Sequence, residues 1–314
     1  MPIWTEPQYT RSEVKRAGKE LRQSLIPLNT DIIKNWRSAH SYPLNLFYID
    51  LKRRARGANP NCVVSQRLKR ISSIHAKLVR EPSMQLTTMQ DIAGCRAILP
   101  AQKDVYQLVR SILSSGIQHE FDHVKDYIAE PKKSGYRSYH LVYRFKSATK
   151  TAYEDMRVEM QLRTGLQHAW ATALETIDFF TRQALKSSQG LQDWERFFVL
   201  MGSALAAKER SPLVPGTPSG KLLKEEICHL NEQLLVIQKL KSYKTFRSIL
   251  GFDQMKKHSY VLLRTVVEEG RGQIRVWGFG EGDLDKAQNL YYAEESKRNG
   301  EVVLEAVIDF VPFE

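Results

Sequence analysis

The sequence predicts an α+β protein in which helices flank a mixed β-sheet and a small ββαβ module follows toward the C-terminus. Three observations lead to this fold class. Strand and helix signals alternate between about residue 95 and residue 184. A Pro-rich stretch at 211–218 then interrupts the pattern. Beyond it, two strand-like runs, a helical run and one more strand-like run follow. We therefore expect a domain at 1–210, a linker at 211–220 and a C-terminal module at 221–314.

Hydrophobic periodicity indicates each element in turn. Apolar residues at helical spacing predict three helices at the start of the chain, the third with a basic opposite face: Ser12–Asn35, Pro43–Arg56 and Val64–Arg80. The alternating part comprises strand Cys95–Pro100, helix Lys103–Ser115, strands Phe121–Ile128, Tyr139–Phe145 and Arg157–Arg163, and helix Gly165–Ala184. The tail comprises helices Lys221–Arg247 and Leu284–Ser296 and strands Ser259–Val267, Gln273–Phe279 and Val302–Ile308, the first two joined by a hairpin at Glu268–Gly272.

Composition is ordinary for a globular protein, and its charge alone is weak evidence of function. The hydrophobic fraction is 42% and the charged fraction is 26% of 314 residues. No apolar run could span a bilayer and Met1–Glu6 lacks signal-peptide features, so we expect a cytoplasmic protein. The net charge of +12 favours nucleotides, RNA or DNA without choosing among them. The 3 cysteines have no zinc-ligand spacing, and we expect reduced thiols.

Three segments carry polar groups in patterns that suit a site. Alternation puts Glu159, Gln161 and Arg163 on one face of their strand, which suits a metal or a base beside phosphates, although for this strand alone a solvated face is the slightly better explanation. The turn after Lys125 surrounds the Tyr136 ring with cations, as phosphate and purine binding would need; an exposed basic loop is the alternative. Asp91 precedes a tight Ala-Gly step, which alone is an ordinary loop-to-strand junction.

Taken together, the motifs resemble a known family. Asp91-Ile-Ala-Gly-Cys-Arg96, Lys125-Asp-Tyr-Ile followed by Pro-Lys-Lys-Ser-Gly-Tyr-Arg-Ser-Tyr-His140, Val158-Glu-Met-Gln-Leu-Arg-Thr164 and His168-Ala-Trp-Ala171 occur in this order. They are similar to the synthetase domain of the RelA/SpoT family of alarmone synthetases, over roughly residues 45–200. The resemblance implies a nucleotidyltransferase-like synthetase fold. Because 314 residues leave no room for the hydrolase and regulatory parts of long members, we expect a small alarmone synthetase.

The resemblance also implies a reaction and its cofactor. The family moves the β,γ-pyrophosphate of ATP to the ribose 3′-hydroxyl of GDP or GTP and needs Mg²⁺. Asp91 and Glu159 match its metal-binding carboxylates, and Glu159 matches the base that activates the hydroxyl. Two carboxylates on neighbouring strands suit a hard cation. The family's ATP-binding positions fall on two arginines for adenine and three cations for the phosphates: Arg67, Arg96, Lys69, Lys77 and Arg80. We expect these three phosphate-binding cations close to one face of the predicted helix Val64–Arg80.

On the acceptor side, Tyr136 matches the tyrosine that stacks on guanine. The expected phosphate contacts and supporting residues of the acceptor are Lys132, Arg137, His140, Gln161 and Arg163. His168 departs from the Asn that small synthetases commonly have there, and long members carry His at this place.

Three functions stay open at this point. The first is synthesis of (p)ppGpp, the alarmone of the stringent response. The second is a toxin that pyrophosphorylates the 3′ end of tRNA; the basic runs 53–56 and 239–244 favour it, although a solvated helix face explains them as well. The third is an inactive relative that binds RNA or protein, which the intact Asp91, Glu159 and Tyr136 oppose. An antitoxin or regulatory partner and a homo-oligomer are further expectations.

Overall fold

The computed structural model describes residues 4–24, 29–114, 117–181, 188–238, 240, 260–268, 271–280, 283, 286, 289–290, 293–294 and 302–305. The chain divides into two compact units, Met1–Leu234 and Leu235–Glu314. The predicted linker at 211–220 lies within the first unit, because the helix that follows it packs back onto the helix before it. Arg196 of the earlier helix and Glu226 of the later one form a two-point ion pair, with the Arg196 Nε 2.6 Å from Glu226 Oε1.

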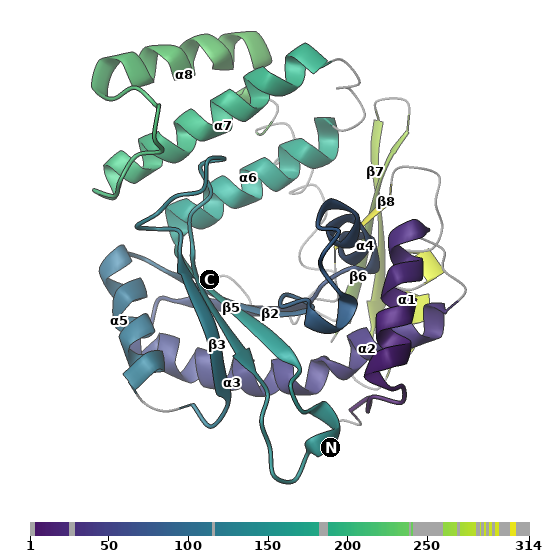
Figure 1. Cartoon of the computed structure of the whole chain (residues 1–314). Helices are drawn as coiled ribbons and strands as arrows, with labels where there is room; N and C mark the ends of the chain where they lie inside the picture. The colour runs from purple at the N-terminus through teal and green to yellow at the C-terminus, as the bar shows by residue number, and fades with distance from the viewer. Residues whose placement is uncertain are drawn as a thin grey trace. The chain divides into compact units, whose positions relative to one another are not determined.

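A five-stranded mixed sheet forms the centre of the first unit (Figure 1). Its strand order is β1-β2-β5-β4-β3; β2 and β5 are parallel and all other neighbours are antiparallel. The strands are β1 Val63–Leu68, β2 Ala93–Leu99, β3 Glu120–Asp126, β4 Tyr139–Arg144 and β5 Arg157–Thr164. The predicted fold class, a mixed sheet with flanking helices, is therefore confirmed.

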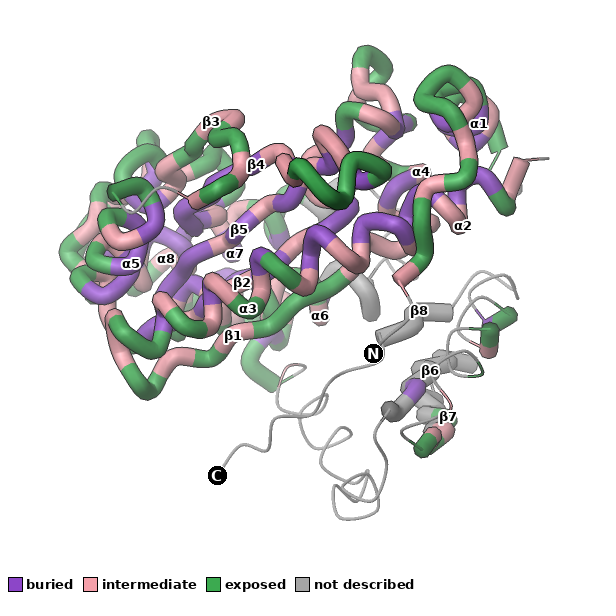
Figure 2. Tube along the Cα trace, turned by 90° about the horizontal axis from the view of Figure 1, so that it is seen from below, coloured by how far each residue is buried: buried purple, intermediate pink, exposed green. Residues whose placement is uncertain are grey.

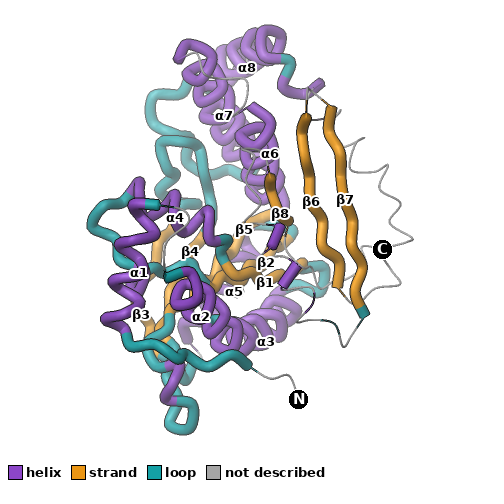
Figure 3. Tube along the Cα trace, turned by 90° about the vertical axis from the view of Figure 1, so that its right-hand side faces the viewer, coloured by secondary structure: helices purple, strands orange, loops and turns teal. Residues whose placement is uncertain are grey.

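Helices lie on both sides of this sheet (Figures 1 and 3). α3 packs along β1 and β2 with α5 beside it, whereas α6, α7 and α8 are stacked on one another. α1 packs against α2 and α4. The helices of the first unit are α1 Arg11–Gln23, α2 Thr30–Ala39, α3 Ser41–Ala58, α4 Ile71–Arg80, α5 Gln102–Ser114, α6 Gly165–Thr181, α7 Ser188–Lys208 and α8 Gly220–Leu234, with short 3₁₀ turns η1 Leu86–Thr88 and η2 Thr151–Tyr153.

The two faces of the sheet differ in chemistry. Along β5, Val158, Met160 and Leu162 are fully buried and belong to the same core as Phe47 and Leu51 of α3. The residues between them are only partly buried until the strand ends, and Figure 2 shows this alternation along the trace. Because side chains alternate along a strand, one face of the sheet carries the hydrophobic core and the other is left for polar groups.

Two helix predictions were wrong. The predicted helix Val64–Arg80 is the strand β1 followed by α4, so Arg67 and Lys69 do not lie on a helix. β1 is an edge strand with a mostly exposed burial pattern, so it has no alternating apolar signal that could reveal it. The predicted helix Ser12–Asn35 is two helices, α1 and α2; the sequence between them contains Pro27, which lacks the N–H that a continuous helix needs.

The second unit contains a three-stranded antiparallel sheet of order β7-β6-β8. Its core includes the fully buried Leu262, with Trp277, Phe279 and Leu290 against it. Its strands are β6 Tyr260–Glu268, β7 Arg271–Phe279 and β8 Val302–Glu305. These match the positions of the predicted strands. Most of the predicted helix Leu284–Ser296, and the predicted helix Lys221–Arg247 beyond residue 240, lie outside the described residues.

Among the described residues, no helix combines the length and the apolar character needed to cross a membrane.

Candidate active site

Strand register builds a polar row across the sheet. Gln161 of β5 lies opposite Arg96 of β2 on one side and opposite His140 of β4 on the other. Its side-chain amide joins both neighbourhoods. The Gln161 Oε1 accepts from the Arg96 Nη2 at 3.2 Å, and the Gln161 Nε2 donates to Glu159 Oε2 at 2.7 Å. The face predicted to hold Glu159 and Gln161 is thus a continuous hydrogen-bonded surface that spans three strands.

Glu159 is held as a carboxylate at one end of this row. Burial alone would raise its pKa, but the hydrogen bonds and charge contributed by His140 and the bond from Gln161 keep the pKa of Glu159 below its usual value. The His140 Nδ1 is 3.0 Å from Glu159 Oε1, and its Nε2 is 2.9 Å from the Tyr136 hydroxyl. Since an ionised carboxylate can only accept, the Nδ1 donates to Glu159, while the Nε2 shares the second hydrogen bond with the Tyr136 hydroxyl. Tyr136, His140 and Glu159 therefore form one chain of hydrogen bonds.

Asp91 forms a second carboxylate centre with two lysines. Lys69 Nζ is 2.9 Å from Asp91 Oδ2 and Lys77 Nζ is 3.0 Å from Asp91 Oδ1. Burial would raise the pKa of Asp91, but the charges and hydrogen bonds of Lys69 and Lys77 lower it to about 2. The charge of Asp91 in turn tends to raise the pKa of Glu159, so the two carboxylates are close enough to interact electrostatically. The site holds two ionised acids before any substrate is bound.

Three arginines and a histidine surround the row, and two of these residues, Arg163 and His168, have buried nitrogens without a hydrogen-bond partner among the described residues. Arg163 is 1% exposed, and its Nε and Nη1 have no hydrogen-bond partner among the described residues. Burial, followed by the neighbouring Arg163 and Arg67 charges, lowers the pKa of Arg96 to about 10. Burial, followed by the charges of Arg163 and Arg96, lowers the pKa of His168 to about 4, so this ring is neutral at pH 7. Clustered cations with orphaned buried donors fit an anionic ligand with several acceptor oxygens.

The loop before β4 carries the aromatic part of the site. Gly135 has φ of +89° and its N–H donates to the Lys132 carbonyl at 2.8 Å, which closes a tight turn. Lys132 Nζ then lies 4.5 Å from the centre of the Tyr127 ring and 5.2 Å from that of Tyr136. The predicted grouping of a cation with the Tyr136 ring is present, and the ring centre of His140 lies 5.8 Å from that of Tyr136 in a T-shaped arrangement.

Some predicted site residues lie apart from this cluster. Arg80 is at the end of α4 with a 70% exposed side chain that pairs with Glu81. Arg67 is exposed on β1, opposite Gly94, but it lies near the cluster: after burial, its charge helps to lower the pKa of Arg96 and of Arg163. Arg137 is 3% exposed and points away from the polar row: its Nη1 donates to the Ile128 carbonyl at 3.1 Å and its Nη2 to the Pro212 carbonyl. Its contacts are those of a structural group.

The donor set fits Mg²⁺ that arrives with a nucleotide. Among the described residues, no group of three or more His, Cys, Asp or Glu side chains is arranged to hold a metal alone. Mg²⁺ commonly takes only one or two carboxylates from the protein and completes its shell with water and phosphate oxygens. Asp91 and Glu159, both ionised and electrostatically coupled, supply that number.

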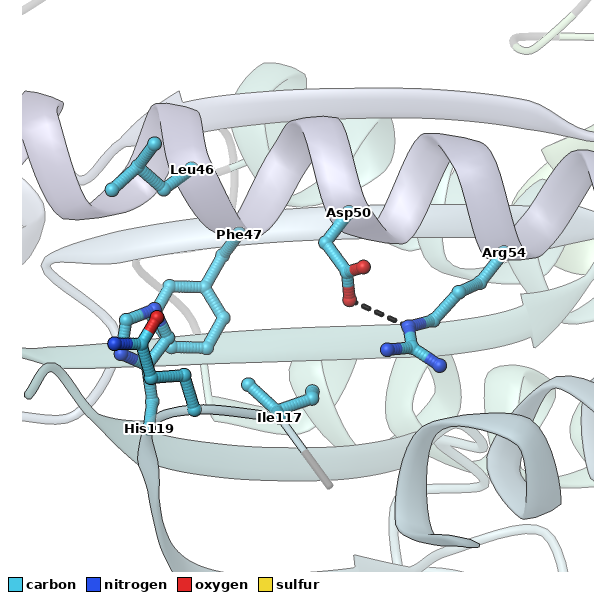
Figure 4. Close-up of a pocket in the computed structure, with 7 residues that line it drawn as sticks. Leu46, Phe47, Asp50, Arg54, Ile117 and His119 are labelled. Atoms are coloured by element: carbon cyan, nitrogen blue, oxygen red, sulfur yellow. Dashed lines mark hydrogen bonds and ion pairs between the residues drawn. The ribbon is translucent and has the colours of Figure 1, made fainter. Parts of the chain in front are cut away.

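A hollow of about 200 Å³ lies elsewhere, between α3 and residues 117–119. Figure 4 shows the Phe47 and His119 rings at one end and the Asp50–Arg54 ion pair at the other. Because α3 packs on the core face of the sheet, this hollow is separate from the polar row. Its two charged groups already have partners: Asp50 and Arg54 pair with each other, and Arg54 also donates to the Ser111 carbonyl at 2.9 Å.

Two supporting contacts were not anticipated from the sequence. Arg37 of α2 is 7% exposed, and its Nε donates to the Lys69 carbonyl at 2.7 Å, which fixes the lysine's backbone. Gly202 of α7 touches the backbone of Gly135. Neither residue belongs to a motif, and α7 was not predicted. A glycine within an otherwise apolar helical run was the only available signal for the second contact.

Comparison with known proteins identifies the region that carries this site. Residues 66–178 match the family described as a region found in RelA / SpoT proteins. The chain is similar to the GTP pyrophosphokinases YjbM and YwaC of Bacillus subtilis (strain 168), with 37% identity over 118 residues and 34% over 122. Each alignment covers 37% of this chain and 56% or 57% of the relative, so the chain spans little more than half the length of these curated relatives.

Among solved structures, the chain is similar to small alarmone synthetase 1 from Bacillus subtilis bound to its product pppGpp. The identity is 26% and the TM-score is 0.46, with 54% of this chain and 89% of that chain covered.

Proposed function

Because the chain carries at residues 66–178 the region found in RelA and SpoT proteins, we propose that it is an ATP-dependent pyrophosphokinase that makes (p)ppGpp. The β,γ-pyrophosphate of ATP passes to the ribose 3′-hydroxyl of GDP or GTP, and AMP is released. The similarity to two GTP pyrophosphokinases supports this reaction. The observation that carries it is an ionised Glu159 on the same sheet face as a cluster of cations with unsatisfied donors.

On the donor side, the lysines bind the triphosphate. Lys69 and Lys77 neutralise Asp91 in the free protein and are within reach of a nucleotide that brings its own cation. Arg80 at the exposed end of α4 extends the phosphate contacts, and Arg67 and Arg96 bind the adenine. Asp91 and Glu159 would hold Mg²⁺, which would supply positive charge to offset the negative charge of the phosphate oxygens.

On the acceptor side, the Tyr136 ring stacks on guanine, and Lys132 and His140 contact the phosphates. Gln161 and Arg163 support these groups, and the neutral His168 ring contacts the base. Glu159 takes the proton of the 3′-hydroxyl. The hydroxyl oxygen then bonds to the β-phosphorus of ATP, while the bond from that phosphorus to the bridging oxygen of AMP breaks. Arg137, buried on two backbone carbonyls, serves the loop and not the phosphates.

Transfer to tRNA is the alternative, and the described residues favour it less. The run 53–56 on α3 is partly used within the helix: Arg53 and Arg54 both bind Asp50 at 2.6 Å, and Ala55 is buried. The second basic run, 239–244, lies outside the described residues apart from residue 240. A long RNA would need phosphate contacts well away from the site, whereas a mononucleotide needs only the cluster around Gln161.

Labelled ATP distinguishes these acceptors. The protein is incubated with Mg²⁺ and ATP that carries its label at the γ-phosphate, and GDP, GTP and deacylated tRNA are offered in parallel. We expect label in guanosine tetra- or pentaphosphate, and none when Mg²⁺ is removed by a chelator. Label in tRNA alone would replace the proposal by the toxin alternative. Label in no acceptor, although ATP binds, would favour an inactive relative.

A further inference from the structure

The loop that carries Tyr136 is in direct backbone contact with α7. A Cβ atom placed on Gly202 would lie 2.8 Å from the Gly135 carbonyl oxygen and 3.0 Å from its Cα. A Cβ placed on Gly135 would lie 3.1 Å from the Phe198 carbonyl oxygen and 3.3 Å from the Val199 Cα. Gly135 also has φ of +89°, a conformation that other residues rarely adopt. Both positions therefore require glycine, because any side chain would push the loop away from α7.

A second contact, made by Arg137, holds the loop on the other side of Tyr136. Arg137 is 3% exposed, and its guanidinium joins the Ile128 carbonyl at the start of the loop to the Pro212 carbonyl beyond the end of α7. Burial lowers the pKa of the Arg137 guanidinium, and the nearby Glu209 charge partly opposes this effect. Glu209 is itself fixed, since its Oε2 accepts from Gln167 Nε2 at 2.9 Å. The segment that follows α7 is thereby tied to the loop and to α6.

Tyr136 lies between these two anchored residues. The α6 residue Trp170 donates from its Nε1 to the Phe198 carbonyl at 2.9 Å, and its ring centre is 6.3 Å from that of Tyr136. From Tyr136 the hydrogen bonds continue to His140 and then to Glu159. A shift of the loop away from α7 would move the Tyr136 ring and loosen this chain at its first link.

We propose that α7 is the positioning element of the acceptor side, and that Gly202 and Arg137 are positioning residues for Tyr136 and, through His140, for Glu159. The identity of the acceptor in this inference rests on the proposed function, whereas the contact between the Tyr136 loop and α7 is independent of it. α7 lies outside the family region at 66–178, so acceptor binding depends on a helix that the region does not include. The donor side has a different support, the bond from Arg37 of α2 to the Lys69 carbonyl.

The test compares Gly202→Ala with Gly57→Ala in the full chain. Gly57 is also helical, but a Cβ placed there meets nothing within 4 Å, so the same chemical change carries no clash. Arg137→Lys is the second variant: it keeps the charge and the approximate length, yet an ammonium group lacks the planar fork that joins the two carbonyls. Two properties are measured: hydrogen exchange of the backbone amides at 129–140 and at 67–80, and the KM values for the acceptor and for ATP.

For Gly202→Ala and Arg137→Lys we expect exchange at 129–140 to become about tenfold faster or more, with 67–80 changed less than about twofold. The acceptor KM should rise about tenfold while the ATP KM stays within about twofold, because only the acceptor loop is displaced. Gly57→Ala should match the wild type in all four measurements.

Unchanged exchange at 129–140 in both variants would overturn the inference, and so would equal acceleration at 129–140 and 67–80, which marks general destabilisation. If the wild type makes no product, the proposed function fails, and the exchange data still decide whether α7 positions the loop. If Gly202→Ala does not fold, Arg137→Lys decides in its place.

Discussion

The Gln161 side chain connects the positive and negative groups of the site. Its carbonyl end faces cations, with Arg96 Nη2 at 3.2 Å and Arg163 Nη2 at 3.4 Å, and its amide end donates to Glu159. A neutral amide with both a donor and an acceptor can join unlike charges without adding a charge of its own. The carboxylate is thereby oriented while the arginines keep donors for a ligand.

Asp91→Asn tests the assignment of the metal. The substitution removes one of two coupled carboxylates and leaves Lys69 and Lys77 without their partner. We expect the Mg²⁺ concentration for half-maximal transfer to rise about tenfold or more, because a hard cation loses a charged oxygen ligand. Transfer is measured over a Mg²⁺ titration, with Asp50→Asn on α3 as the control. An unchanged Mg²⁺ dependence in Asp91→Asn would remove this residue from the metal site.

His40 makes stability depend on pH. It is 1% exposed at the junction of α2 and α3, and burial lowers its pKa from 6.5 to about 4, partly opposed by its hydrogen bond to the Trp36 carbonyl. Between pH 6.5 and 4, His40 is therefore protonated in the unfolded chain but stays neutral in the folded chain. The free energy of unfolding should fall by up to about 3 kcal/mol as pH drops through this window, and not change further from this residue below it.

Urea unfolding of the wild type and of His40→Gln, measured at pH 7 and at pH 4.5, isolates this contribution. His168 titrates in the same direction, so the difference between the two proteins is the relevant quantity. We expect the loss of stability on acidification to be smaller in His40→Gln. An equal loss in both proteins would show that His40 is not the group responsible.

At the residue scale, the sequence identified the polar row but not every role. Strand alternation was sufficient to place Glu159 and Gln161 on one face, since it depends only on the backbone. Arg137 belongs to the same motif, yet its guanidinium turns to the Ile128 and Pro212 carbonyls. That direction depends on a partner 75 residues away in the sequence, which no local pattern contains.

Among the elements, β1 explains why the predicted helix Val64–Arg80 was wrong. Within the part of the chain that the structure describes, Val63–Leu68 pairs with β2 alone and is largely exposed, so packing imposes no apolar alternation on it. The helical signal of α4 was then extended backward over it. As a consequence, Lys69 and Lys77 converge on Asp91 from a loop and from a helix, not from one helix face. Central strands such as β5 were found because burial of one face imposes an alternation of apolar and polar residues on their sequences.

A pair of glycine substitutions tests how closely α1 packs against η1. A Cβ on Gly18 of α1 would lie 2.6 Å from the Leu86 Cβ in η1, and Leu86 is 1% exposed, so neither side has room. Gly18→Ala should lower the free energy of unfolding by about 1–3 kcal/mol through overpacking. Gly57→Ala in α3 should leave it unchanged or raise it by up to about 1 kcal/mol through helix propensity. Chemical denaturation of both variants checks this; equal effects would contradict the packing described here.

At the scale of the whole molecule, the site extends beyond the region that carries its motifs. The chemical groups lie within residues 66–178, whereas their supports come from either side: Arg37 of α2 fixes Lys69, and Gly202 of α7 fixes the loop of Tyr136. The core shows the same dependence, since α1, α2 and α3 contribute Leu21, Trp36 and Phe47 to the cluster under the sheet. Motifs reveal chemistry, but supports are set by tertiary contacts that leave no short pattern.

The net charge of +12 also needs the structure before it can be interpreted. Part of the positive charge is neutralised within the fold, as in Lys146, which is within 3.3 Å of Glu120, Glu154 and Asp155. Another part is concentrated where burial, together with neighbouring arginine charges, lowers the pKa of Arg96 and of Arg163. Repulsion of this kind destabilises the free protein and is relieved when a polyphosphate binds, so the cluster indicates a nucleotide site more specifically than the total charge does.

Single-turnover pyrophosphate transfer by Glu159→Gln tests the central claim most directly. The substitution keeps the shape and the hydrogen bond with Gln161 but removes the charge and the proton acceptor. We predict that transfer to GDP or GTP falls by about 10³-fold or more while ATP binding, measured by calorimetry, weakens far less. The control is Glu195→Gln, exposed on α7, which should transfer at the wild-type rate. Transfer by Glu159→Gln within about tenfold of the wild type would contradict the account, because the base and metal ligand would then have to be another residue.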